Sequence, residues 1–246
     1  MAENDLGKIW YLKKINLLEP LTKEQMDYLA SHCAMQEYKP KEIIYHPKKG
    51  QNLIFFLKKG LVRLYRLDPN GKEYTLALLG QGESFGALAS FSEKLQESPS
   101  ESQDEENQNP EFAQALEPTL VCFIPKELFF EMTKESPLLH LRISKMLGLR
   151  LIEVSMLVEE MAFKSVIQRV ASLLLRLDKK FGKEIKGERV ISLSLTHYDL
   201  STMIGATREA TTVALDKLKK LEAIEIRRKR IILKNSELLK EIQNGF

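Results

Sequence analysis

The fold of this chain is decided by residues 195–232, which read LTHYDLSTMIGATREATTVALDKLKKLEAIEIRRKRII. Thr196 followed three positions later by Asp199 is a helix N-cap pattern, and Gly205 permits the tight turn that two crossed helices need. A second helix begins after Thr207, and its apolar residues recur at spacings of mostly three and four. A basic run follows between two apolar segments. The pattern predicts a helix-turn-helix with a basic wing, and it points to double-stranded DNA as the partner.

The second helix leaves a set of polar side chains outside its apolar stripe, and these are the candidate DNA contacts. Arg208 and Glu209 stand at its N-terminal end, the part of a recognition helix that meets base edges. Arginine can bind guanine through two hydrogen bonds, and glutamate can accept one from cytosine N4. Thr211, Thr212 and Lys217 follow on the same helix. Pattern alone leaves a second interpretation open, an ordinary amphipathic helical hairpin with a solvated face.

The positive charge of the chain is concentrated at this end. Residues 165–246 hold 17 Lys and Arg against 10 Asp and Glu, although the net charge of the whole chain is only +3. A DNA-binding domain needs such an excess, because its cations displace counterions from phosphates. The N-terminus lacks the apolar segment of a secretory signal, and no stretch is apolar enough to span a membrane. We therefore expect a cytoplasmic protein without membrane contact.

The chemistry-bearing residues exclude several classes of function. The chain has two cysteines, Cys33 and Cys122, which suits a reducing compartment and rules out a four-cysteine zinc or iron–sulfur site within one chain. Its four histidines show no diagnostic spacing, so we expect no metal site. The sequence contains no nucleophile elbow, P-loop or dinucleotide-binding fingerprint, so we expect no enzymatic activity.

The N-terminal half predicts an antiparallel β-roll or barrel. A helix is predicted within residues 15–35, where Thr22 and Gln25 resemble a capping box. After it, short segments rich in β-branched and aromatic residues alternate with turn residues, up to a last strand at residues 120–124. Residues 92–111 interrupt this pattern with 7 acids and one lysine, a composition that predicts a mobile acidic loop. This loop is either an insertion without function or a gate or partner contact.

Residues 138–161 predict one long helix that is apolar over more than one face. We expect it to pack on the roll with one face and on a second copy of the chain with another. A single buried helix is the alternative. A homodimer joined in this way would give the two helix-turn-helix elements half-sites about one helical turn of DNA apart. A further helix is predicted at residues 165–181, before turn residues at 182–187 and a short strand at 190–193.

The order of these parts resembles the cAMP receptor protein/FNR family of bacterial transcription regulators. Three motifs carry the resemblance: FFLKKGLVRLY at residues 55–65, GQGESFGALASF at 80–91, and the helix-turn-helix itself. The resemblance implies an α+β fold, with a β-roll of the cyclic-nucleotide-binding kind over residues 1–137, a long dimerisation helix over 138–163 and a winged helix-turn-helix over 164–246. It also implies a homodimer on a palindromic DNA site, which contacts RNA polymerase if the protein is an activator.

The effector pocket that the resemblance implies departs from the family pattern. Members that bind cAMP carry Gly-Glu-x-Ala and then an arginine for the cyclic phosphate, whereas this chain has Gly86, Ala87, Leu88 and Ala89. No arginine occurs between residues 66 and 142, and the adenine-contacting Thr-Ser pair aligns with Val154 and Ser155. A buried phosphate without a cation is poorly compensated, so we do not expect cAMP as effector and predict no cofactor.

Several alternatives stay open for the effector. Haem, a redox signal through the cysteines, another small molecule that the protein needs before it binds DNA, and no ligand at all are each compatible with the sequence. A cyclic-nucleotide-binding module whose winged helix makes only protein contacts is a further interpretation.

The DNA-contacting positions implied by the resemblance are also partly changed. The family's second base-reading arginine is Val213 here, which predicts a half-site whose base at this position is either unread or contacted through a thymine methyl group. Thr196 and Thr207 keep their places, and Thr196 matches a family phosphate contact. The wing is expected to grip the DNA backbone without reading sequence, through Arg227, Arg228, Lys229 and Arg230. A hinge near residues 161–165 is expected to couple the roll to the reading helices.

Overall fold

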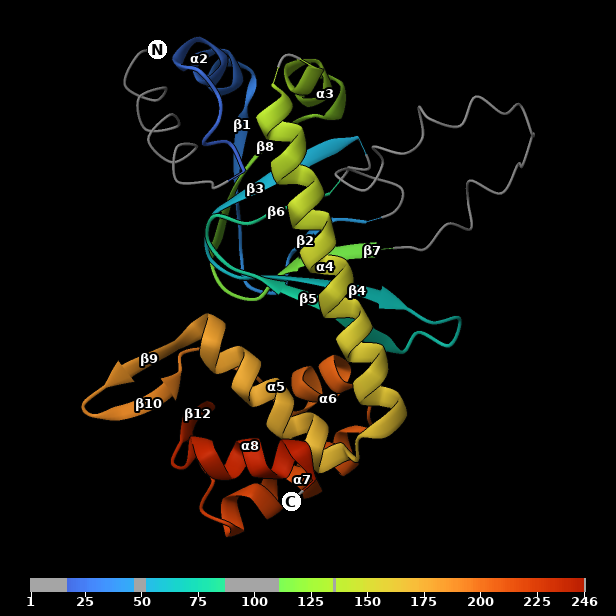
Figure 1. Cartoon of the computed structure of the whole chain (residues 1–246), viewed down its shortest axis with the longest axis vertical. Coiled ribbons are helices and arrows are strands. Elements are labelled where there is room, and N and C mark those ends of the chain that lie inside the picture. The colour runs from blue at the N-terminus through green and yellow to red at the C-terminus, as the bar shows by residue number, and fades with distance from the viewer. Residues whose placement is uncertain (1–16, 47–51, 87–110, 135, 246) are drawn as a thin grey trace. The chain divides into compact units, whose positions relative to one another are not determined.

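The computed structural model of the chain describes residues 17–46, 52–86, 111–134 and 136–245 (Figure 1). The chain divides into two compact units, one ending at Leu149 and one beginning at Arg150. The dividing point lies inside one continuous helix, α4 (Pro137–Phe163), so the predicted dimerisation helix is shared between the two units. Within the described ranges, no helix is long and apolar enough to cross a bilayer.

The first unit contains two four-stranded sheets, which have the strand orders β1-β8-β3-β6 and β2-β7-β4-β5. All the described strand pairs in these sheets are antiparallel, as the α+β prediction with a β-roll requires. The strands are β1 (Ala34–Tyr38), β2 (Ile43–Tyr45), β3 (Leu53–Lys59), β4 (Val62–Leu67), β5 (Glu73–Leu79), β6 (Ser84–Gly86), β7 (Glu111–Ala115) and β8 (Thr119–Pro125).

The core of the roll draws on both sheets and is aromatic at its centre. Tyr45 of β2, Phe55 of β3 and Phe85 of β6 are all buried in it. The ring centroid of Phe55 lies 5.5 Å from that of Tyr45 and 5.1 Å from that of Phe85, and both pairs are stacked. Interiors are close-packed, and stacked rings of this size fill the space around them. The roll is therefore filled by its own side chains at this point.

A second core lies on the other face of the β1-β8-β3-β6 sheet, where three helices cover it: α2 (Lys23–His32), α3 (Lys126–Lys134) and the first part of α4. Leu139 and Ile143 anchor α4 there, and Cys33 and Cys122 are buried in the same cluster. Helix α2 begins at Thr22 with a capping box, as the sequence predicts. The first half of α4 is thus part of the roll's own hydrophobic core.

The second unit contains the predicted helix-turn-helix together with a small sheet of order β11-β12-β10-β9. Its elements after α4 are α5 (Val166–Phe181), β9 (Gly182–Ile185), β10 (Glu188–Ile191), α6 (His197–Ile204), α7 (Arg208–Lys220), β11 (Ile224–Arg227), β12 (Arg230–Leu233) and α8 (Ser236–Asn244). Helix α5 contacts α6, α7 and α8, so it is the central support of the unit.

Two boundaries differ from the sequence prediction. Residues 182–187 were predicted as turn residues only, but they form β9 and the turn of a β9–β10 hairpin, which is clear in Figure 1. The segment GKEI lacks the run of β-branched residues that marks a strand, so the pattern missed it. Glu111, predicted as the end of the acidic loop, begins β7, and the rest of that loop lies outside the described residues.

Candidate DNA-binding site

Helix α6 begins and ends where its local sequence dictates. The hydroxyl of Thr196 accepts the N–H of Asp199 at 3.1 Å, and the Asp199 carboxylate accepts the N–H of Thr196 at 2.7 Å, which completes the predicted capping box. Gly205 ends the helix with a φ of 61°, a left-handed conformation that suits a residue without Cβ. Arg169 of α5 donates to the carbonyl oxygen of Ile204 at 2.7 Å, so the turn is also tied to α5.

Helix α7 presents one face to the core of its unit and another to solvent. Thr207 caps it by accepting the N–H of Ala210 at 3.1 Å. Its buried stripe consists of Thr211, Ala214, Leu215 and Leu218. Outside the stripe stand four of the predicted DNA contacts, all of them exposed: Arg208, Glu209, Val213 and Lys217. Val213 has 56% of its surface exposed, so an apolar side chain projects from the reading face.

The two threonines of α7 have different surroundings. Thr211 has no exposed surface, and its hydroxyl donates to the carbonyl oxygen of Thr207 at 2.9 Å. The prediction that Thr211 contacts DNA is therefore wrong, because this residue belongs to the buried stripe. Thr212 is half-buried, and its hydroxyl donates to the carbonyl oxygen of Arg208 at 2.9 Å. That hydroxyl also lies 2.9 Å from Nδ1 of His197.

The contact between His197 and Thr212 fixes what Thr212 can offer to a ligand. When the hydroxyl of Thr212 donates to the carbonyl oxygen of Arg208, it accepts from Nδ1 of His197 in the tautomer that carries its proton on Nδ1. The hydroxyl then has one partner as donor and one as acceptor. Sequence reasoning treated His197 as a structural residue and missed this contact, since nothing in the spacing of 15 positions marks the pair.

The wing is the two-residue turn of the β11–β12 hairpin. Arg227 and Arg230 face each other across the hairpin, and Arg228 and Lys229 between them have φ values of 49° and 63°. Both are left-handed, a conformation that costs about 1 kcal/mol or more for a residue with a Cβ, and such turns normally carry Asn-Gly. Backbone strain of this kind is retained mostly at functional positions. Here it places two exposed cations at the tip of the hairpin.

Arg227 does not fit its predicted role as a phosphate contact. Its guanidinium is hydrogen-bonded to the carboxylate of Glu225 and donates to that of Glu188 at 2.8 and 3.2 Å. The hydrogen bonds of Glu225 and Glu188 raise the pKa of the Arg227 guanidinium. Two carboxylates already balance its charge and would repel a phosphate. Arg227 instead joins β11 to β10, and the pattern could not show this because Glu188 is 39 positions away.

Comparison with known proteins finds a known domain family for each of the two units. Residues 35–136 match a family model described as a cyclic nucleotide-binding domain, and residues 168–242 match one described as a Crp-like helix-turn-helix domain. The chain belongs to the CRP/FNR family of transcription regulators. This CRP/FNR-family regulator is 28% identical to the "Global nitrogen regulator" of Nostoc sp., over 80% of this chain and 83% of that protein. It is 26% identical to the "Cyclic AMP receptor protein" of Thermus thermophilus, over 96% of this chain and 100% of that protein.

Solved structures agree with this placement. A variant of CooA from Carboxydothermus hydrogenoformans matches with a TM-score of 0.68 at 27% identity, covering 88% of this chain and 89% of that one. A crp/fnr-family transcriptional regulator from Eubacterium rectale matches with a TM-score of 0.70 at 23% identity, covering 95% and 100%. The second match concerns the fold alone. The relative from Nostoc sp. is named as a regulator, which agrees with the sequence prediction.

The predicted effector positions of this CRP/FNR-family regulator are divided between the end of β6 and the second half of α4. Ala87, Leu88 and Ala89 lie outside the described residues. Gly86 ends β6, and a Cβ there would come within 2.5 Å of the carbonyl oxygen of Leu53. Val154 and Ser155 are exposed on α4 and belong to the other unit. The hydroxyl of Ser155 donates to the carbonyl oxygen of Leu151 at 2.9 Å.

The buried cations in the described part of the roll are Lys58 and Arg63. Arg63 is the one arginine that is buried among the described residues of the first unit. Its guanidinium lies 2.7 Å from the carboxylate of Glu73 and donates to Oε1 of Gln114 at 3.0 Å. A carboxylate therefore already balances its charge.

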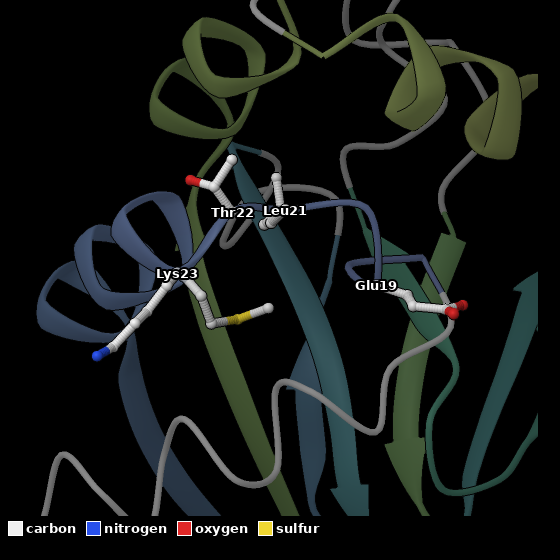
Figure 2. A pocket seen from close by; sticks show the side chains of 5 residues that line it. Glu19, Leu21, Thr22 and Lys23 are labelled. Atoms are coloured by element: carbon white, nitrogen blue, oxygen red, sulfur yellow. The ribbon is translucent and has the colours of Figure 1, made fainter.

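A hollow of about 370 Å³ lies at the start of α2 (Figure 2). It is lined by Glu19, Leu21, Thr22, Lys23 and Met26. Figure 2 shows the charged ends of Glu19 and Lys23 pointing in opposite directions, and the carboxylate of Glu19 lies 2.7 Å from Arg142. The polar groups among these lining residues do not converge, so they do not form a binding site for a charged effector.

Proposed function

We propose that this CRP/FNR-family regulator binds double-stranded DNA sequence-specifically, as a homodimer, through α7 and the wing turn. The observation that carries the proposal is the exposed N-terminal end of α7, because a recognition helix meets base edges with that end. Arg208 and Glu209 stand there as readers of guanine and cytosine. Positions around them would hold phosphates without reading sequence, and these are Thr196, Thr207, Lys217, Arg228, Lys229 and Arg230.

The proposed dimer forms through the second half of α4. Leu151, Val154, Val158 and Met161 follow one another at spacings of three, four and three, the spacing of a coiled-coil seam. Their exposed fractions are 68%, 47%, 62% and 39%. We call these four residues the dimer seam. An apolar row of this length is unusual on the surface of a single chain, and a second α4 running parallel to the first would cover it with the same row.

The bases read after Arg208 and Glu209 should be recognised by apolar contact. The hydroxyl of Thr212 lies against the carbonyl oxygen of Arg208 and Nδ1 of His197, and we propose that Thr212 contacts DNA through its methyl group. Val213 beside it is apolar and exposed. An apolar surface in the major groove recognises the C5-methyl group of thymine. We therefore propose a half-site that carries thymine where family members with an arginine at the position of Val213 read another base.

Selection of bound fragments from random-sequence DNA by the purified full chain, without added ligand, tests this proposal. We expect a palindromic motif with thymine opposite Val213. Replacing that thymine by deoxyuridine removes only a methyl group, and should weaken binding about fourfold, the equivalent of roughly 0.8 kcal/mol for a buried methyl-sized group. The same replacement at a thymine outside the motif is the control. Binding without any motif would refute the proposed function.

The proposed regulator does not use cAMP. Support comes from the paired charge of Arg63, from the filled aromatic centre of the roll and from Ala87 in the place of the family's glutamate. Titration calorimetry of the full chain with cAMP should give no binding heat, and a saturable heat would contradict this.

We also propose no enzymatic activity, with residues 1–137, 138–163 and 164–246 acting as roll, dimerisation helix and DNA-binding domain. Contact with RNA polymerase would follow if the regulator is an activator.

A further inference from the structure

A buried cluster of charged and polar side chains joins the end of α4 to α5. Glu160 is only 5% exposed, and its two carboxylate oxygens accept from Nη1 of Arg176 at 2.8 and 2.7 Å. Nζ of Lys164 donates to the same carboxylate at 3.2 Å and to Oγ of Ser172 at 3.0 Å. We call Glu160, Lys164, Ser172 and Arg176 the elbow cluster. All four residues belong to the second unit.

The elbow cluster spans the break between two consecutive helices. Helix α4 ends at Phe163 and α5 begins after its N-cap Ser165, whose N–H donates to Oε1 of Gln168 at 2.8 Å. Glu160 is therefore on one side of the break and Arg176 on the other. Any turn of α5 relative to α4 about this short connection pulls the guanidinium of Arg176 away from the carboxylate of Glu160.

Separation of these groups is unfavourable because the carboxylate of Glu160 is buried, although the side chains of Arg176 and Lys164 are 34% and 24% exposed. Ser172 is 1% exposed, and a buried charge that loses its partner has neither water nor counter-charge to stabilise it. Burial raises the pKa of Glu160, but the hydrogen bonds and charge of Arg176, with smaller contributions from Ser172 and Lys164, outweigh it and lower the pKa overall. The carboxylate is thus ionised at neutral pH and holds both cations in one arrangement.

We propose that the elbow cluster fixes the angle between the dimer seam of α4 and the reading helix α7. Helix α5 contacts α6 and α7 directly, so whatever orients α5 also orients the helix-turn-helix. The dimer seam and the helix-turn-helix also fall in the same compact unit. The connection near residues 161–165 is expected from the family resemblance to act as a hinge. The ion pairs around the buried carboxylate of Glu160 therefore hold this connection at one angle. This inference rests on the proposed function and makes Glu160 and Arg176 positioning residues for DNA binding.

A fixed elbow has a consequence for the spacing of half-sites. Each base pair inserted between two half-sites turns one relative to the other by about 35°, since a helical turn of DNA has about 10 base pairs. A dimer with two fixed elbows cannot follow that rotation, so it should accept one spacing only. A dimer whose elbows turn freely should tolerate the insertion, with a weaker affinity at the native spacing.

Affinity for the selected operator, with and without one inserted base pair, tests the positioning role. The test variant combines Glu160→Leu, Lys164→Met and Arg176→Met, which removes the directional ion pairs and leaves no unpaired charge behind. The single variant Glu160→Gln strands both cations and serves to show the cost of breaking the cluster. Glu159→Gln, at the exposed neighbouring position, is the matched control.

The expected results differ clearly between these variants. Insertion of one base pair should weaken binding by about 100-fold for the wild type and for Glu159→Gln, and by less than about tenfold for the triple variant. At the native spacing the triple variant should bind about 10- to 100-fold more weakly, because only a fraction of its elbows are in the competent orientation. A triple variant that discriminates between spacings as strongly as the wild type would overturn the proposal.

The angle of the elbow can be measured without DNA. Spin labels at Glu153→Cys on α4 and Lys240→Cys on α8, in the full chain with Cys33→Ala and Cys122→Ala, report one distance within a protomer when the labelled protein is diluted with unlabelled protein. We expect a narrow distance distribution for the wild-type cluster and a broad one for the triple variant. Equal widths would overturn the elbow proposal. A narrow wild-type distribution from a chain that selects no DNA motif would instead refute the proposed function.

Discussion

Replacing Arg228 by Asn and Lys229 by Gly separates the stability of the wing turn from its contribution to DNA binding. Both residues have positive φ values, 49° and 63°. Each left-handed residue with a Cβ costs about 1 to 2 kcal/mol, whereas asparagine tolerates this region well and glycine is unstrained there. The added freedom of glycine in the unfolded chain offsets roughly 0.5 to 1 kcal/mol of the gain. The free energy of unfolding of the Arg228→Asn/Lys229→Gly variant should therefore rise by about 1 kcal/mol, measured by urea denaturation.

The same variant should bind DNA more weakly and with a smaller dependence on salt. In the proposed dimer it removes four cations from the two wings. Each phosphate contact that is lost lowers the slope of log affinity against log salt concentration by about 0.9, so the slope should fall by about 3 to 4. Fluorescence anisotropy with the selected operator, repeated over a series of salt concentrations, measures this slope directly.

A matched control exists in the other hairpin of the same sheet. Lys186 has a φ of 54° in the β9–β10 turn and is exposed, but it has no predicted DNA contact. Lys186→Asn should raise the free energy of unfolding without changing the salt slope. If the wing variant keeps the wild-type slope, the wing cations do not hold phosphates. If the wing variant is less stable than the wild type, the reasoning from left-handed strain is refuted.

Three further predictions concern the dimer seam, the reading face and the elbow cluster. Val158→Glu places a charge in the middle of the dimer seam and should give a monomer in analytical ultracentrifugation, whereas unchanged dimerisation would place the interface elsewhere. Val213→Arg should shift the selected base from thymine to guanine by roughly tenfold or more, and an unchanged motif would contradict the assigned reading position. Glu160→Gln should lower the free energy of unfolding at neutral pH by about 3 kcal/mol. The folded pKa of Glu160 lies below its ordinary value of 4.5, so the ionised carboxylate stabilises the fold above pH 4.5 and this stabilisation is lost as the pH falls through the folded pKa. The free energies of unfolding of the wild type and of Glu160→Gln should therefore converge in acid. A difference that stays constant with pH would refute this.

Features that depend on neighbouring residues could be predicted from the sequence. The N-caps at Thr22, Thr196 and Thr207 each involve a partner three positions away, and all three are present as predicted. The left-handed end of α6 at Gly205 is equally local. The apolar residues of α4 likewise predict its length to within a few residues.

Features that depend on distant partners could not be predicted in this way. Arg227 belongs to a basic run, and only the fold shows that Glu188 neutralises it from another strand. Glu160 and Arg176 are separated by a helix break, so neither helical spacing nor charge pattern connects them. For Thr211 the residue type and the helical position disagree. Its position on α7 matches the buried stripe, but its polar hydroxyl favours the solvent-exposed face.

The dimer seam also ties the lifetime of the chain to its abundance. A solitary chain leaves Leu151, Val154 and Val158 largely uncovered, and such surfaces are recognised by chaperones and proteases. Pairing hides them, and while the chain is scarce the amount of paired protein rises with the square of its concentration. Chains made slowly would thus stay monomeric and be degraded, whereas chains made in a burst would dimerise and be protected. The occupancy of its DNA sites would then rise steeply once the supply of the chain passes a threshold.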